Sequence, residues 1–456
     1  MNTSASPDAA APRLAPSLAT QLHHTARCVL AVEQGHSLSE ILPQVAAGLR
    51  PGVQALTFHV LRRLGTARAL VARLAPRKPD PAVQAMLCCA VALLVDEPGT
   101  EPGTTAAPYL PHTVVNQAVE AVQQQRSTQR AAAFVNACLR RLLRERDVLM
   151  LSVSADVEAR WNHPRWWVEL LQRDHPDHWE AILQANNRPG PMTLRVNRRM
   201  TDVASYQQAL LALDMPTRVV GDDGLVLETP QPVDRLPGFA SGLCSVQDAA
   251  AQLAAPLLLA GRDGLVGARV LDACAAPGGK TAHLLERADL DLLALDMDPK
   301  RCTRVTDTLQ RLRLHAEVRA ADAAHPADWW DGRPFDAILL DAPCTASGIV
   351  RRHPDVRWLR RASDVAQLAA VQQQLLEALW PLLKPGGGLV YATCSVFRAE
   401  GSGQVASFLE RHTDAVLWPS PGHLLPGNVG DPAGFHDNEP GGHDGFFYAR
   451  IDKALA

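Results

Sequence analysis

Two cysteines stand where a thiol could reach a bound ring. Cys344 lies in Asp341-Ala-Pro-Cys344 and Cys394 in Thr393-Cys-Ser395, each just past a predicted strand. Because neighbouring parallel strands end at the same edge of a sheet, we expect both thiols at one rim. A thiolate there could attack an electrophilic ring carbon if nearby positive charge or backbone N–H groups lower its pKa. The alternative for any cysteine is a small buried apolar residue.

A run of small residues from Cys274 to Lys280 could bring the backbone close to a ligand. It follows a predicted strand and precedes a predicted helix, and Gly278 and Gly279 permit close approach. The dinucleotide signature G-x-G-x-x-G is absent, and the Walker A signature fails because Cys274 occupies its first glycine position. A structural turn without a ligand remains the alternative.

Acidic residues recur at the ends of four predicted strands, at Asp272, Asp296, Asp322 and Asp341. An acid at the end of the second strand is well placed to accept hydrogen bonds from ribose hydroxyls. Singly, each acid is more often a turn residue or a helix cap. Their recurrence favours a ligand site along one edge of the sheet.

Arginines cluster in two places. The helical segment near residue 140 carries Arg140, Arg141 and Arg144 along one face, which is either a solvated surface or a contact for RNA phosphates. The second cluster surrounds one tryptophan, and its side chains could pair phosphates and stack on unpaired bases, with a solvated helix and loop as the alternative. Its members are Arg351, Arg352, Arg357, Trp358, Arg360 and Arg361.

The elements that must position these residues form three predicted regions after a disordered tail at residues 1–12. Residues 13–150 have apolar side chains at three- and four-residue steps, which predicts an all-α domain of five to seven helices. Residues 151–240 predict a small α+β linker subdomain. Its helices are expected at Trp161–Leu171 and Trp179–Asn186, and its short strands at Pro191–Asn197, Thr217–Val220 and Gly224–Leu227. Residues 241–456 alternate strand and helix, which predicts a doubly wound, Rossmann-like α/β domain. Its strands are expected at Arg269–Ala273, Leu292–Asp296, Glu317–Ala321, Ala337–Leu340 and Gly388–Ala392.

Composition sets wide limits. The 456 residues are 47% apolar and 20% charged, which excludes a disordered or collagen-like chain. The net charge of −3 hides an asymmetry, because residues 1–150 hold 15 basic and 10 acidic residues. The longest apolar run, Ala85–Val95, is too short to span a bilayer, and no secretory signal is evident, so we expect a cytoplasmic protein. Nine scattered cysteines without a C-x-x-C pair favour neither disulfides nor a metal site.

These motifs together resemble those of the RNA cytosine-5 methyltransferases that depend on S-adenosylmethionine. The resemblance rests on Asp272–Thr281, Asp341–Cys344, Arg351–Trp358 and Thr393–Ser395, with flanking similarity at Val246–Gln252 and Asp444–Tyr448. The helical segments Thr113–Glu120 and Phe134–Arg140 resemble a NusB-like RNA-binding domain. That pairing of domains is characteristic of enzymes that act on 16S rRNA, so the resemblance implies 16S rRNA as partner. We expect the protein to act as a monomer.

The resemblance also implies roles for individual residues. Cys394 would be the nucleophile, Cys344 would assist breakdown of the covalent adduct, and Asp341 would lie at the edge of both the cytosine and the cofactor. Asp296 would hold the cofactor ribose and Asp322 its adenine end. RNA would meet Arg140, Arg141, Arg351, Arg352, Arg357 and Trp358. The loop that wraps S-adenosylmethionine would consist of Cys274, Ala275, Ala276, Pro277, Gly278, Gly279 and Lys280.

Three alternatives stay open: a tRNA-modifying relative, a non-catalytic RNA adaptor, and a Rossmann dehydrogenase, which the missing G-x-G-x-x-G disfavours. The chain also departs from the family pattern. Glu400 is followed by Gly401 where a Glu-Asn pair is common, and Thr345-Ala-Ser347 replaces Ser-Gly-Thr. Residues 422–443 are unusually rich in Gly, Pro, Asp and His.

Overall fold

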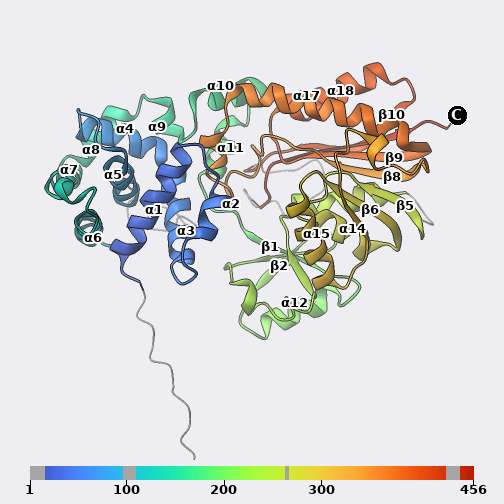
Figure 1. Cartoon of the computed structure of the whole chain (residues 1–456), viewed down its shortest axis with the longest axis horizontal. Coiled ribbons are helices and arrows are strands. Elements are labelled where there is room, and N and C mark those ends of the chain that lie inside the picture. The colour runs from blue at the N-terminus through green and yellow to red at the C-terminus, as the bar shows by residue number, and fades with distance from the viewer. Residues whose placement is uncertain (1–15, 96–108, 262–265, 428–441, 456) are drawn as a thin grey trace, which may run out of the picture. The chain divides into compact units, whose positions relative to one another are not determined.

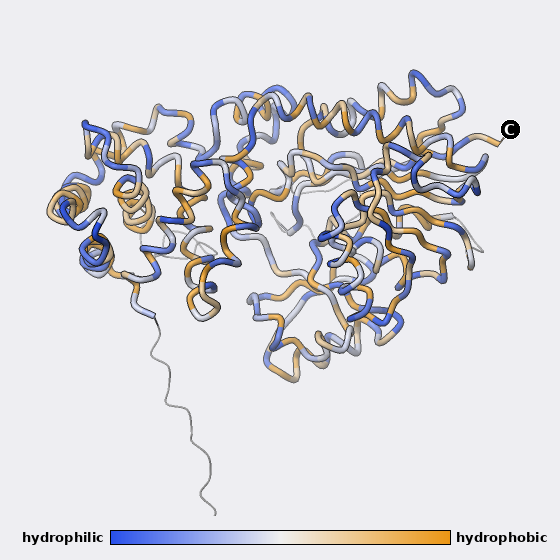
Figure 2. Tube along the Cα trace, viewed as in Figure 1, coloured by the Kyte–Doolittle hydropathy of each residue, from blue (hydrophilic) through white to orange (hydrophobic). Residues whose placement is uncertain are grey.

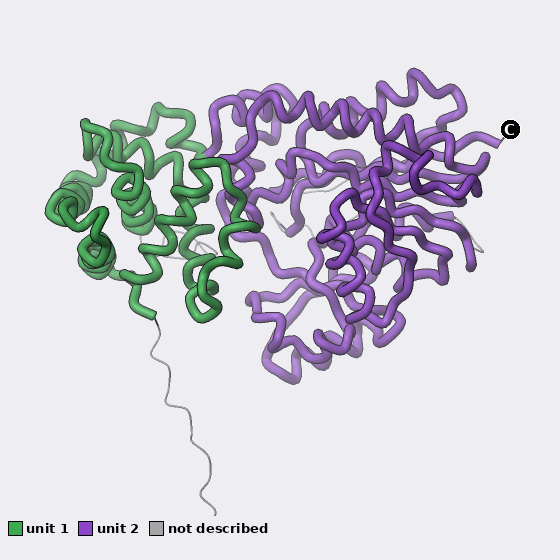
Figure 3. The backbone as a smooth tube through the Cα atoms, in the orientation of Figure 1, with its two compact units in different colours: residues 1–162 green, residues 163–456 purple. Residues whose placement is uncertain are grey.

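The computed structural model describes residues 16–95, 109–261, 266–427 and 442–455 (Figure 1). The chain divides into two units, residues 1–162 and residues 163–456, shown in green and purple in Figure 3. The predicted tail at residues 1–12 and most of the Gly/Pro-rich segment after residue 427 lie outside the described residues. No helix in the described ranges is both long and apolar enough to cross a membrane.

The first unit is helical, as predicted. Its central helix, α5, is capped by the Asp80 side chain, which accepts a hydrogen bond from Ala82 N, and Pro81 occupies its first turn. From Ala85 to Val95 every residue is buried, so the helix is apolar on all sides and is surrounded by α1, α3, α4, α6 and α7. The helices of this unit are α1 (Leu18–Glu33), α2 (Leu38–Ile41), α3 (Arg50–Arg62), α4 (Leu64–Leu74), α5 (Pro81–Leu94), α6 (Pro111–Gln123), α7 (Ala132–Arg144), α8 (Arg146–Val153) and α9 (Val157–Trp161).

The helical unit ends later than the expected boundary at residue 150. Thr66 on α4 donates its hydroxyl to Ala159 O over 2.6 Å, and Thr66 N donates to Asn162 Oδ1 over 2.9 Å. These bonds hold α9 against α4. The predicted helix at Trp161–Leu171 is therefore wrong as one element, because α9 ends at Asn162 in a left-handed conformation (φ 55°) and Pro164 precedes the next helix.

The second unit begins with a small antiparallel sheet in the order β2-β3-β1-β4. It has its own apolar core, which includes Leu194, Val196, Tyr206, Leu210 and Leu225. The predicted strands appear as expected, and β4 is an addition. The elements here are α10 (Arg165–Asp174), α11 (Trp179–Asn186), β1 (Met192–Val196), α12 (Val203–Leu211), β2 (Thr217–Val220), β3 (Gly224–Leu227) and β4 (Cys244–Val246).

A seven-stranded sheet forms the rest of the second unit, in the order β10-β11-β9-β8-β5-β6-β7. The five strands β5 to β9 are parallel, which confirms the predicted α/β domain, whereas β11 runs antiparallel to both β9 and β10. The strands are β5 (Ala268–Asp272), β6 (Leu290–Asp296), β7 (Glu317–Ala320), β8 (Phe335–Asp341), β9 (Leu383–Thr393), β10 (Ala415–Leu424) and β11 (Phe446–Lys453).

Helices cover both faces of this sheet, with α14 and α15 on one side and α17 and α18 on the other (Figure 1). Alternate strand residues explain the arrangement. Val270 packs into one core cluster and Leu271 into the other, as the strand period of two requires. Figure 2 shows the hydrophobic colour running along these strands. The helices of this part of the chain are α13 (Ala254–Leu259), α14 (Gly279–Arg287), α15 (Pro299–Leu312), α16 (Val356–Leu359), α17 (Ala362–Leu379) and α18 (Ser402–Arg411).

Candidate active site

Cys344 and Cys394, the cysteine pair, meet at the carboxyl edge of the large sheet. β8 and β9 are parallel neighbours, and Asp341 lies opposite Ala392 in their register. Beyond the strands, Gly348 N donates to Cys394 O over 2.9 Å, so the two following loops stay joined. The two Sγ atoms are 3.3 Å apart. One ring bound at this rim can therefore be within reach of both sulfurs.

The surroundings of Cys344 favour its protonated form. The pKa of Cys344 is raised well above its ordinary value, first by its hydrogen bond with Cys394 and then by burial. Cys344 therefore keeps its proton at neutral pH. Either sulfur can be the donor of the hydrogen bond between them.

A cation stands beside the pair. Lys280 Nζ lies 2.6 Å from Asp341 Oδ2, and the two side chains are 13% and 27% exposed. Burial lowers the pKa of Lys280, but attraction to Asp341 and then to Cys394 outweighs burial and leaves that pKa raised. The ammonium thus remains charged next to Asp341.

The small-residue run wraps the ends of β5 and β6. Ala275 N donates to Leu295 O over 2.8 Å, and Ala276 N donates to Asp296 Oδ2 over 3.3 Å. Gly278 has a φ of +95°, and a Cβ there would lie 3.1 Å from Val305 Cα, so this turn requires glycine. Pro277 O accepts from Thr308 Oγ1 over 3.0 Å. These contacts fix the loop just before α14 begins at Gly279.

The acids of the strand ends have different surroundings. Asp296 is 2% exposed and its carboxylate already accepts from Arg301 Nη1 over 3.2 Å and from Asp298 N over 3.1 Å. Asp322 is exposed and pairs with His325 Nδ1 at 3.1 Å.

Burial, together with the carboxylates Asp341, Asp272 and Asp296, raises the pKa of Cys274. Cys274 therefore lines the loop as a neutral thiol.

The hydrogen bonding of Asp272 indicates whether a cofactor fits beside the small-residue loop. Its Oδ2 accepts from Thr281 Oγ1 over 2.6 Å, whereas its buried Oδ1 has no hydrogen-bond partner among the described residues. Burial raises the pKa of Asp272 to about 7, against the hydrogen bond from Thr281, which lowers it. A buried acceptor without a partner suits a ligand that brings a donor, such as the amino group of S-adenosylmethionine. The loop and its acids therefore fit that cofactor.

The arginine cluster near Trp358 requires a correction. Arg351 is 2% exposed and forms an ion pair with Asp444, which is 1% exposed. Arg352 pairs with the same Asp444 and, over 2.7 Å, with Asp248. Asp248 and Asp444 belong to the two flanking motifs named above, so these interior arginines connect those motifs to the carboxyl edge of the sheet. The prediction that they contact RNA is therefore wrong for Arg351, which is enclosed, and Arg352 is already paired with two carboxylates.

Arg357 is likewise interior, with no exposed surface, and donates to Asn187 Oδ1 over 2.5 Å and Asn186 O over 2.6 Å. Its prediction as an RNA contact is also wrong, because these acceptors occupy the guanidinium. Trp358 is half-buried. Arg360, in contrast, donates through Nη2 to Cys344 O over 3.2 Å and so supports the loop of the cysteine pair.

The predicted basic face of the helical unit lies on α7. Arg140 is exposed and donates to Asn136 Oδ1 over 3.1 Å on its own helix. Arg141 is paired with Glu145 at 2.9 Å, which neutralises its charge locally. Arg144 is exposed and makes no ion pair in the described part of the chain. Arg140 and Arg144 are thus the cations this face offers to solvent.

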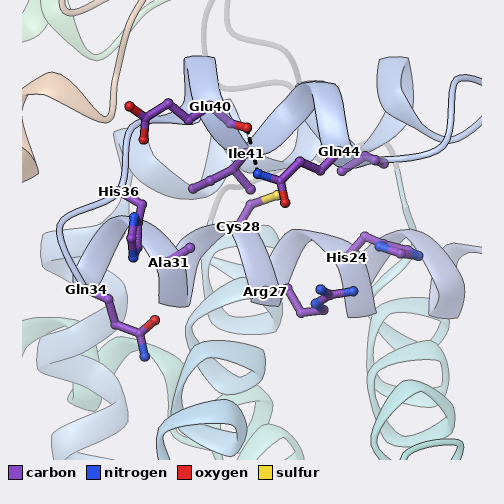
Figure 4. Close-up of a pocket in the computed structure, with 10 residues that line it drawn as sticks. His24, Arg27, Cys28, Ala31, Gln34, His36, Glu40, Ile41 and Gln44 are labelled. Carbon is purple, nitrogen blue, oxygen red and sulfur yellow. Dashed lines mark hydrogen bonds between the residues drawn. The ribbon is translucent and has the colours of Figure 1, made fainter.

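A separate cavity of about 350 Å³ lies in the helical unit between α1 and α2 (Figure 4). His24 and Arg27 line one wall and Glu40 and Gln44 the other, where Gln44 Nε2 donates to Glu40 O over 3.0 Å. Burial, followed by repulsion from Arg27, lowers the pKa of His24, so its ring is neutral at pH 7. None of the site residues predicted from the sequence lines this cavity.

One buried acid at the rim had appeared in the sequence only as part of a departure from the family pattern. Glu400 has no exposed surface, and its carboxylate accepts hydrogen bonds from Thr345 and Ser395. These two residues directly follow Cys344 and Cys394. The sequence contained one signal for this residue, because Glu400 comes shortly after β9, as other acids of the site follow their strands. The hydrogen-bond partners of Glu400 could not be predicted from the sequence.

A parallel α/β sheet with a small-residue loop after its first strand and an acid after its second defines the class of Rossmann-like domains that bind a nucleotide-containing cofactor. Residues 258–452 match the family model described as 16S rRNA methyltransferase RsmB/F, and residues 163–234 match the ferredoxin-like domain of RsmF/B-like methyltransferases.

Relatives extend the similarity over nearly the whole chain. A ribosomal RNA small subunit methyltransferase B from Vibrio cholerae is 41% identical over 441 residues, covering 92% of this chain and 94% of that protein. Its counterpart from Salmonella typhi is 42% identical over 436 residues, covering 93% and 96%. The chain therefore belongs to the RsmB/F family and is an S-adenosylmethionine-dependent RNA methyltransferase.

Solved structures share the fold. The crystal structure of PH0851 superposes with a TM-score of 0.71 at 24% identity and covers 94% of this chain and 99% of that one. A methyltransferase homolog protein from Pyrococcus horikoshii has a TM-score of 0.54 at 27% identity, covering 65% and 97%. The first of these matches includes the helical unit as well as the sheet.

Proposed function

We propose that this protein methylates carbon 5 of a cytosine in 16S rRNA through a covalent adduct with Cys394. The observation that carries the proposal is the 3.3 Å separation of the cysteine pair beside the Lys280–Asp341 ion pair. A methyltransferase that needed only to orient a nucleophilic nitrogen or oxygen would have no use for two thiols at its rim. Cytosine C5 is a poor nucleophile, so it requires activation by attack at C6.

The residues divide this chemistry between them. Cys394, as thiolate, forms a bond to C6, and the electron pair of the C5–C6 double bond becomes available at C5. S-adenosylmethionine supplies the electrophilic methyl group that C5 then takes up. A base removes the C5 proton, and those electrons re-form the double bond and expel the Cys394 thiolate. Cys344, which is protonated beside Cys394, assists this release and returns the pair to its starting state.

Two neighbours position the reacting ring. Asp341 lies at the end of β8 and accepts hydrogen bonds from the ring edge, while Lys280 holds its carboxylate in place. The residues from Cys274 to Lys280, with Asp272 and Asp296, hold the cofactor. Because a stacked base hides its C6 atom, the cytosine enters this rim unpaired or flipped out.

We assign RNA positioning to the helical unit, which we take to be a NusB-like domain. Arg140 and Arg144 on α7 present free positive charge, which suits phosphates of the rRNA backbone. This domain favours rRNA over tRNA as the substrate.

A labelling experiment tests the proposal. Purified protein is incubated with methyl-labelled S-adenosylmethionine and either naked 16S rRNA or a tRNA pool, and the labelled base is then identified. We expect 5-methylcytosine in the rRNA. Label in tRNA alone would favour the tRNA-modifying alternative, and no label at cytosine C5 in either RNA would contradict the proposed reaction.

A further inference from the structure

Glu400 receives hydrogen bonds from both cysteine-bearing loops at once. Thr345 N donates to Oε1 over 2.8 Å, and Thr345 Oγ1 donates to Oε2 over 2.5 Å. Ser395 Oγ donates to the same Oε2 over 2.6 Å. Since Thr345 follows Cys344 and Ser395 follows Cys394, one carboxylate connects the residues next to both sulfurs.

Glu400 is itself held in place from the sheet side. Its backbone carbonyl accepts from Tyr391 Oη over 2.8 Å and from Thr393 Oγ1 over 3.2 Å. Gln372 Nε2 on α17 adds a longer bond of 3.3 Å to Oε1. Both the backbone and the side chain are thus fixed to β9 and to the helix that covers it.

The residue after Glu400 fits the same arrangement. A Cβ at Gly401 would lie 2.5 Å from His423 Cε1 and 2.8 Å from Phe447 Cδ2. The turn that carries Glu400 therefore packs closely on His423 of β10 and Phe447 of β11, and these rings would have to shift to admit a side chain at residue 401. The departure from the Glu-Asn pair lies at this close contact.

No arginine, lysine or histidine forms an ion pair with Glu400 in the described part of the chain. Burial raises its pKa, while the hydrogen bonds from Ser395 and Thr345 act in the opposite direction. A buried acid without a cation, satisfied by hydroxyl and amide donors, is more suited to holding loops than to transferring protons.

We propose that Glu400 is a positioning residue that sets the separation of Cys344 and Cys394. The inference rests on the proposed function in one respect only, which is that both thiols act on one ring. The positioning of the two loops does not depend on the proposed reaction, because the Glu400 carboxylate binds Thr345 and Ser395 whatever the protein catalyses. Removal of the carboxylate should loosen the two loops at the residues next to the sulfurs, while the bond from Gly348 N to Cys394 O remains.

The test uses two substitutions of the full-length protein. Glu400→Ala leaves Thr345 N–H and two hydroxyls without their acceptor. Glu400→Gln keeps one oxygen for Thr345 N, and its amide can donate to the two hydroxyls after they rotate. We expect Glu400→Ala to lower kcat by about 100-fold, as a displacement on the order of 1 Å can do, with the KM for S-adenosylmethionine unchanged. Glu400→Gln should stay closer to the unsubstituted protein.

A second measurement reports the sulfur separation without RNA. Phenylarsine oxide condenses with two close thiols and releases water, so it captures the cysteine pair only while both sulfurs can reach one arsenic atom. The unsubstituted protein and Glu400→Gln should be captured, whereas Glu400→Ala and the control Cys344→Ala should lose capture. This readout remains valid even if the protein proves to methylate another position, so the two proposals can fail separately.

Three outcomes would overturn the inference. The first is a folded Glu400→Ala variant whose kcat is unchanged. The second is a Glu400→Ala variant that loses kcat but is still fully captured by phenylarsine oxide. The third is a Glu400→Gln variant that loses as much kcat and capture as Glu400→Ala. Thermal unfolding checks that each variant folds. If Glu400→Ala does not fold, Thr345→Val with Ser395→Ala removes the same hydroxyl bonds while it keeps the carboxylate. That double variant must then show the reduced capture and the reduced kcat.

Discussion

Lys280 Nζ lies 2.6 Å from Asp341 Oδ2, so an ion pair links the residue just after the small-residue loop to the end of β8. A second lysine–aspartate pair of the same length, Lys384 Nζ with Asp336 Oδ1, lies in the same two-strand region but at the other end of β8. The two ion pairs have the same chemistry but lie at opposite ends of β8. Substitutions in each pair can therefore distinguish a role at the carboxyl edge from a general effect of ion pairs on the stability of the sheet.

Lys280→Met should lower kcat/KM for S-adenosylmethionine by about 10- to 100-fold, because loss of a charged hydrogen bond costs about 1.5–3 kcal/mol. Lys384→Met is the matched control and should leave kcat/KM close to that of the unsubstituted protein, since its pair is partly exposed. Steady-state kinetics on both variants measures the difference. Equal losses in the two would place the effect in the sheet as a whole.

Substitution of each cysteine should give a different product. Cys394→Ala should abolish methyl transfer and leave no covalent RNA complex, because the attacking sulfur is gone. Cys344→Ala should still form the adduct but release it slowly, so a protein–RNA band should accumulate on a denaturing gel. If Cys344→Ala abolished the adduct and Cys394→Ala accumulated it, the two roles would be exchanged.

The buried Asp272 predicts a pH dependence of stability. Its pKa is raised from 3.8 to about 7 on folding, so between those values the folded protein binds a proton that the unfolded chain releases. Stability from this group is present below pH 4 and is lost as the pH rises to 7. Asp272→Asn, which stays uncharged, should therefore raise Tm relative to the unsubstituted protein more at pH 7.5 than at pH 4. A Tm difference that is constant with pH would contradict this assignment.

Arg351→Ala should act on folding. It removes one of the two arginines that pair with the enclosed Asp444, and loss of a partner from a buried ion pair costs up to about 3–5 kcal/mol. Arg361→Ala, from the same cluster but exposed, is the control and should change stability by no more than about 0.5 kcal/mol. Urea unfolding measures both. A stable Arg351→Ala protein with weakened RNA binding would restore the original prediction for this residue.

Arg140→Ala should act on RNA binding. Loss of one phosphate contact should weaken rRNA binding and reduce the slope of log K against log salt by about 1. Arg141→Ala should have less effect on that slope, since Arg141 is already paired with Glu145. Filter binding over a range of salt concentrations distinguishes the two. Identical slopes for all three proteins would argue against a phosphate contact on this face.

The sequence predicted the rim well because strand ends follow local rules. Apolar runs identify β5, β6, β8 and β9, and the parallel order then brings the residues after them to one edge. The two antiparallel strands of the large sheet, β10 and β11, were not predicted, and for β10 the reason is local. β10 contains Pro419 and Pro421, which read as a loop, and its pairing with β11 is indeed irregular between Trp418 and Gly422.

Side-chain partners far along the chain could not be predicted. Arg351 bonds to Asp444, 93 residues later, and Arg357 bonds to Asn187, 170 residues earlier. Local spacing cannot distinguish an arginine that meets such a partner from one that faces solvent. The same limit hid the role of Glu400, whose contact with Thr345 spans 55 residues.

The position of β11 has a consequence for biosynthesis. β9, which leads into Cys394, is flanked by β8 on one side and by β11 on the other, and β11 is synthesised after every other strand described here. While the nascent chain is still emerging, β9 is an open edge and Asp444 has not yet reached Arg351. Domains usually fold as units during synthesis. The pairing of β11 with β9 and the ion pair of Asp444 with Arg351 can therefore form only after residues 444–453 have left the ribosome.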